Sequence, residues 1–164
     1  MNPLLAYLWP CLAAGLLAGG ISGLFAFRRK RWSPLIIAAL LAIAAAAAWH
    51  GPVGAADRFR ATIERQAREA LDNYEMAKVT AHLHRAPLTR RLVLVGRVDD
   101  WQTGELVRLF SQLPGVSRAT WSERDAGLPL IAEAVAAAIG GFLLGLLLAY
   151  LLELRRRYNA QWTW

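Results

Sequence analysis

The sequence is poor in cysteine and contains no recognisable catalytic motif. Cys11 is the only cysteine in 164 residues, which excludes an intramolecular disulfide and a metal site built from several thiolates. A nucleophile elbow, a phosphate-binding loop and a metalloprotease helix are all missing from the sequence. We therefore expect a non-enzymatic protein that uses no metal, no cofactor and no small-molecule substrate.

Charged residues are absent from three long apolar stretches. These stretches are Leu4–Phe27, Pro34–Trp49 and Ala134–Leu152, with 24, 16 and 19 residues respectively. A helix needs roughly 20 apolar residues to cross the hydrocarbon core of a bilayer. The sequence thus predicts three transmembrane helices, the second of them completed by residues after Trp49. No basic residue precedes the first stretch, so we expect an uncleaved anchor and not a secretory signal.

The net charge of +7 is concentrated beside these stretches. Gly51–Gly127 contains twelve Lys and Arg against ten Asp and Glu, a balance that does not favour nucleic acid as a partner. The surplus lies in Arg28–Arg31 and Arg155–Arg157. Because basic residues in short loops stay cytoplasmic, the N-terminus should lie outside and the C-terminus inside. We expect a bacterial inner-membrane protein whose segment 51–127 is periplasmic.

The chain is predicted to divide into residues 1–50, 51–127 and 128–164, with the middle part folding as a small α+β domain. Apolar residues from Phe59 to Tyr74 follow a helical period, and Val79–His84 and Arg91–Val98 alternate like two strands of a hairpin. Asp99 or Asp100 is a candidate N-cap for a second helix, which Pro114 and Gly115 would end. A short strand follows, so the expected order is α-β-β-α-β.

The segment 92–98, the helix after it and the segment 113–119 together resemble a BON domain. Gly96 and Val98 match the Gly-x-Val of that family, and Gly115 and Val116 match the Gly-Val that opens its last strand. The resemblance covers about residues 68–121. It implies a bacterial envelope module associated with phospholipid contact and envelope integrity. A ring-forming domain of secretion machines has a similar element order and is the alternative.

Small residues recur every four positions in the predicted membrane helices. Such spacing places them on one helix face and lets a second helix approach closely. A tight bundle follows, either within the chain or with a partner. The candidate packing residues are Gly15, Gly19 and Gly23 in the first helix, and Ala137, Gly141 and Gly145 in the third.

Three arginines surround the predicted hairpin connection. Arg85, Arg90 and Arg91 are candidates for contact with lipid phosphates or with a partner, while solvated loop arginines are the simpler reading. His82 and His84 share one face of a strand, but zinc would need a third ligand, so a polar sheet face is the preferred interpretation.

Four further positions have predicted structural roles. Gly96 is expected where a helix crosses the strand closely or the sheet bulges, and Gly115 where the backbone turns left-handed after a helix. Tyr7 is expected in an interfacial aromatic belt, and Glu133 at the outer membrane boundary in the first turns of the third helix.

The sequence favours an accessory or assembly subunit of a larger membrane complex. Its partners would be membrane lipids and other membrane subunits, or further copies of itself. The alternatives are a stand-alone envelope factor that binds anionic phospholipid headgroups, and a ring-forming or channel- and secretion-associated component.

Overall fold

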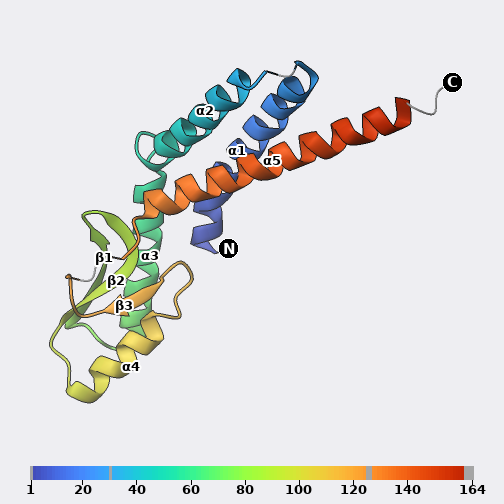
Figure 1. The fold of residues 1–164 in the computed structure, drawn as a ribbon. Coiled ribbons are helices and arrows are strands. Elements are labelled where there is room, and N and C mark those ends of the chain that lie inside the picture. The colour runs from blue at the N-terminus through green and yellow to red at the C-terminus, as the bar shows by residue number, and fades with distance from the viewer. Residues whose placement is uncertain (1, 30, 125–126, 161–164) are drawn as a thin grey trace. The chain divides into compact units, whose positions relative to one another are not determined.

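The computed structural model describes residues 2–29, 31–124 and 127–160, and within these ranges it contains five helices and a three-stranded sheet (Figure 1). The long helices are α1 (Pro3–Arg29), α2 (Ser33–His50) and α5 (Leu130–Ala160), and each is long and apolar enough to span a membrane. Lys30, Asp125, Trp162 and Trp164, which belong to segments considered above, lie outside the described residues.

The chain forms two compact units. The α+β unit combines the start of the chain up to Tyr7 with Gly54–Glu133, and the helical unit combines Leu8–Val53 with the chain from Ala134 onward. These boundaries differ from the predicted division, because the first turns of α1 and α5 belong to the α+β unit. Tyr7 is 3% exposed and its ring centroid lies 5.7 Å from that of Phe59 on α3, so its side chain packs inside the α+β unit, while its predicted membrane depth stays a prediction.

The α+β unit has the predicted order α-β-β-α-β. Its elements are α3 (Ala55–Asn73), β1 (Val79–Arg85), β2 (Leu88–Gly96), α4 (Asp100–Phe110) and β3 (Arg118–Thr120). The sheet order is β1-β2-β3, with β1 antiparallel and β3 parallel to the central strand β2. The hairpin register shifts between Leu83 and Arg85, at the end of β1.

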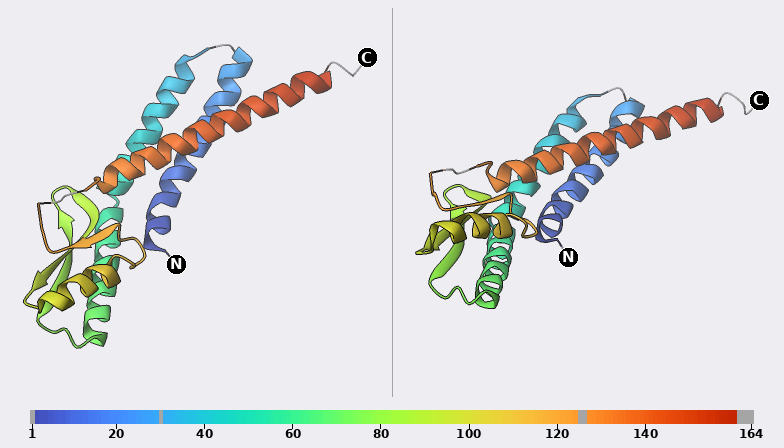
Figure 2. Two further views of the ribbon diagram at one scale, coloured as in Figure 1. Left: turned by 60° about the horizontal axis from the view of Figure 1, so that its bottom comes forward. Right: turned by 90° about the horizontal axis from the view of Figure 1, so that it is seen from below.

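Large apolar side chains fill the core of this unit. Helix α3 contacts β1 and α4 contacts β3, and Figure 2 shows α3 running alongside the sheet. Ile63 from α3, Phe110 from α4, and Leu83 and Leu92 from the sheet are each at most 1% exposed. Asp99, one of the two predicted candidates, is the N-cap of α4. Its backbone N–H donates to Oε1 of Gln102 at 3.4 Å as part of a capping box.

Candidate functional site

Helices α1 and α5 touch through their backbones in the helical unit. Gly15 lies against Ala138, Gly19 against Phe142 and Gly23 against Ala149, so the two helices run parallel. A Cβ on Gly15 or Gly19 would overlap a carbonyl oxygen of α5, and a Cβ on Gly23 would lie 2.8 Å from that of Ala149. Only glycine permits this separation of the two helix axes.

The α5 side of this contact is built in the same way. A Cβ on Gly141 would overlap the carbonyl oxygen of Leu12, and one on Gly145 would overlap that of Leu16. Ala137 is half-buried, and its fully buried neighbour Ala138 is the residue opposite Gly15. The predicted small-residue contact is therefore intramolecular. Of the six predicted packing residues, Ala137 is replaced by its neighbour Ala138.

The parallel arrangement brings the two basic clusters to the same end of the bundle. The ring centroids of Phe27 on α1 and Tyr150 on α5 are 5.8 Å apart in an edge-to-face contact. Beside them lies a cavity of about 420 Å³. It is lined by Ala26, Phe27, Arg31, Trp32, Leu35, Tyr150, Glu153, Leu154 and Arg157. We call it the basic-end cavity.

Glu153 is a buried carboxylate on the wall of the basic-end cavity. The Nε atom of Arg157 lies 3.1 Å from one of its oxygens, and the Nε atom of Arg156 lies 3.3 Å from the other. Two guanidinium groups thus compensate one carboxylate, and Arg31 adds a further positive charge to the lining. Sequence reasoning identified both basic clusters, but the cavity depends on the register of α1 against α5.

The structure separates the three hairpin arginines. Arg90 forms an ion pair of 2.9 Å with Glu133, and both side chains are largely buried. The side chain of Arg91 packs over Gly127, and its backbone N–H donates to Oγ1 of Thr89 at 3.3 Å. Arg85 is exposed and lines an open pocket with His82 and His84. These residues therefore do not present three uncompensated charges on one surface.

The pair Arg90–Glu133 joins the sheet to the first turn of α5. Next to it, Thr89 forms an isolated antiparallel bridge with Pro129, and Thr89 is fully buried. Glu133 lies in the first turn of its helix as predicted, but its partner comes from β2. The ion pair and the bridge together fasten the start of a long apolar helix to the α+β unit.

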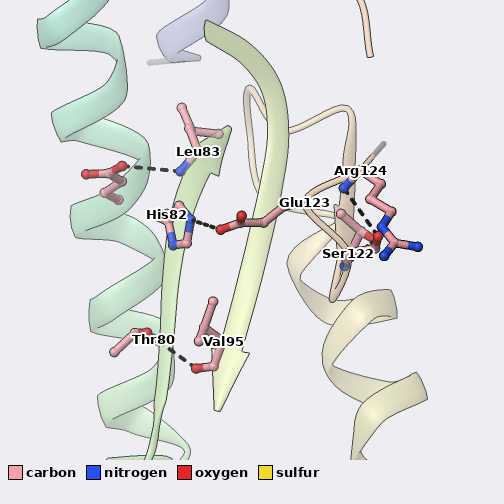
Figure 3. Close-up of polar contacts among 9 residues, drawn as sticks. Thr80, His82, Leu83, Val95, Ser122, Glu123 and Arg124 are labelled. Atoms are coloured by element: carbon pink, nitrogen blue, oxygen red, sulfur yellow. Dashed lines mark hydrogen bonds and ion pairs between the residues drawn. The ribbon is translucent and has the colours of Figure 1, made fainter. Parts of the chain in front are cut away.

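The histidines lie on the polar face of the hairpin. Figure 3 shows Glu123, from the segment after β3, directed toward His82, with 3.6 Å between Oε1 and Nε2. Nδ1 of His84 lies 3.0 Å from the Pro87 carbonyl oxygen. Among the described residues, no group of three His, Cys, Asp or Glu side chains has the geometry of a metal site.

Of the two candidate structural glycines, Gly115 agrees with its prediction and Gly96 does not. Gly96 is opposite Val79 in the hairpin, and a Cβ there would lie 2.6 Å from the Lys78 carbonyl oxygen. The expected helix crossing or bulge at Gly96 is therefore wrong, because the close neighbour is the start of β1. Gly115 has a φ of +98°, in agreement with the predicted left-handed backbone, and packs against Ile63.

Comparison of the chain with protein-family models, curated proteins and solved structures finds no match.

Proposed function

We propose that this chain is a non-enzymatic, multi-pass membrane protein that serves as an accessory or assembly subunit of a larger inner-membrane complex. The observation that carries the proposal is the distribution of side chains in the helical unit. Small residues occupy the contact between α1 and α5, while large apolar residues remain exposed on all three long helices. A surface of this kind is stable when lipid or another membrane helix covers it.

The basic clusters support an orientation with the N-terminus outside. Because α1 and α5 are parallel, Arg31 and Arg157 line one cavity at one end of the bundle. Arginines near the ends of membrane helices favour the cytoplasmic side. The α+β unit, inserted between the end of α2 and the start of α5, is then periplasmic. We also propose that this unit is a BON-like domain. Its element order and the positions of Gly96 and Gly115 support that proposal.

A groove between α1 and α2 is the proposed binding surface for a partner subunit. Its volume is about 450 Å³, and its lining contains no charged residue. It is lined by Ala18, Ile21, Ser22, Phe25, Ser33, Pro34, Ile37, Ala38 and Leu41. The glycine faces of α1 and α5 are already in contact, so we place the partner helix in this groove instead.

Gentle detergent extraction followed by native mass measurement tests the subunit proposal. We expect the chain to co-purify with a larger membrane protein at fixed stoichiometry. Ile37→Trp should fill the groove and release the partner, whereas Ile36→Trp, at an exposed neighbour that does not line the groove, should retain it. Recovery of a lone monomer, or equal behaviour of the two variants, would contradict the proposal.

Contact with anionic phospholipid is a second candidate function. The observation that favours it is the basic-end cavity, where two arginines meet aromatic and aliphatic side chains. The cavity lies in the helical unit, so this function differs from the hairpin-arginine contact expected from the sequence.

A further inference from the structure

We propose that the basic-end cavity binds one anionic phospholipid, with its phosphate between Arg31 and Arg157 and the start of an acyl chain against Phe27 and Leu154. The inference rests on the proposed membrane location of α1, α2 and α5. Nothing in the sequence pattern alone predicts this site, because its lining comes from three separate parts of the chain.

The charges in the cavity favour an anion. Glu153 is the acidic residue of the lining, and its carboxylate is already engaged by Arg156 and Arg157. The contact to Arg157 uses Nε, which leaves the terminal amino groups of that guanidinium for a further acceptor. Arg31, which precedes α2 in the chain, is the second arginine of the lining. A phosphate diester accepts hydrogen bonds from arginine pairs of this kind.

The apolar part of the lining favours a lipid over a free anion. Phe27, Leu35, Tyr150 and Leu154 provide hydrocarbon surface next to the arginines, and Trp32 is largely exposed at the rim. Inorganic phosphate would leave this surface in contact with water. The volume of about 420 Å³ falls within the range of roughly 300–1,000 Å³ that is usual for ligand pockets.

The position of the cavity along the helices also fits a lipid headgroup. Phe27 ends the uncharged stretch of α1, and Glu153 follows the uncharged stretch of α5. In a bilayer, these positions lie where hydrocarbon gives way to headgroups. Tryptophan and tyrosine are enriched at that level, and arginines there attract anionic lipids.

Native mass spectrometry of the full chain, delipidated in a neutral detergent, tests the assignment. The probes are phosphatidylglycerol, phosphatidylcholine and inorganic phosphate, each titrated separately. We expect one phosphatidylglycerol per chain, in preference to phosphatidylcholine. Arg31→Gln should weaken that binding about fivefold, as expected for one arginine near an anionic lipid. Arg155→Gln is the matched control, because Arg155 is exposed and does not line the cavity.

Three outcomes would overturn the site. The first is equal affinity of the chain for phosphatidylglycerol and phosphatidylcholine. The second is equal affinity of Arg31→Gln and Arg155→Gln for phosphatidylglycerol. The third is displacement of phosphatidylglycerol by an equal concentration of inorganic phosphate, which would indicate a free-anion site. A separate measurement distinguishes failure of the membrane proposal from failure of the lipid site. If alkaline washing releases the chain from membranes, the membrane location itself is wrong, whatever the lipid titrations give.

Discussion

The two units place the same kinds of residue in opposite positions. In the α+β unit the large apolar side chains lie inside, as with Ile63, Leu92 and Phe110. In the helical unit glycine and alanine lie inside, and leucines such as Leu143 and Leu147 face outward. Water drives large apolar groups into a core, whereas hydrocarbon solvates leucine as well as a protein interior does. In the proposed membrane location, close backbone packing would therefore hold α1 against α5, and burial of apolar area would contribute little.

Leucine truncation should show the contrast most strongly. Leu92 is 0% exposed and Leu143 is 59% exposed. We expect Leu92→Ala to reduce the free energy of unfolding by about 2–5 kcal/mol, because a cavity remains in the core. Leu143→Ala should change it by less than about 0.5 kcal/mol. Urea unfolding of the full chain in mild detergent, followed by circular dichroism, measures both. Equal losses would mean that the two units share one packing principle.

In the helical unit, adding a methyl group to a glycine should destabilise the chain more than truncating an exposed leucine. Gly141→Ala places a methyl group against the backbone of α1, which cannot move away without separating the helices. We expect a loss of about 3 kcal/mol, at the upper end for overpacking. The matched control is Gly140→Ala, since a Cβ there meets nothing within 4 Å. Unfolding of both variants in mixed micelles with increasing sodium dodecyl sulfate makes the comparison. A Gly141→Ala chain as stable as the control would argue against backbone contact.

Glycine in the α+β unit follows the same steric rule within the hairpin. Gly96→Ala would bring a methyl group to 2.6 Å from the Lys78 carbonyl oxygen, so we expect a loss of about 1–2 kcal/mol. Gly104→Ala lies in α4 with open space around it and should gain about 0.5–1 kcal/mol from its better helix propensity. Thermal unfolding would shift in opposite directions for the two variants. If both variants shifted the unfolding temperature in the same direction, the predicted steric conflict at Gly96 would be contradicted.

The sequence was sufficient for features that depend on local periodicity and composition. The three apolar helices and the order α-β-β-α-β follow from hydropathy and from alternation, both of which are local. The sequence was insufficient for contacts between distant segments. The register that sets Gly15 against Ala138, and the burial of Tyr7 beside Phe59, depend on how remote elements meet. The basic-end cavity is a consequence of such a register, so periodicity could not reveal it.

The pair Arg90–Glu133 is another contact that periodicity does not reveal, since 43 residues separate its members. Its side chains are 23% and 17% exposed, so water screens the pair only in part. We expect Glu133→Gln to cost about 1 kcal/mol, above the usual value for surface pairs and below that for fully buried ones. The pair Arg108–Glu105 provides the control, because its side chains are 71% and 44% exposed.

Glu105→Gln should therefore change stability by less than about 0.5 kcal/mol. Unfolding at low and at high salt sharpens the contrast, because salt screens exposed pairs more than partly buried ones. The cost of Glu133→Gln should persist in high salt, while any cost of Glu105→Gln should disappear. If salt abolishes both costs equally, Arg90 and Glu133 behave as a solvated surface pair. The attachment of α5 to the sheet then rests mainly on the backbone bridge between the buried Thr89 and Pro129.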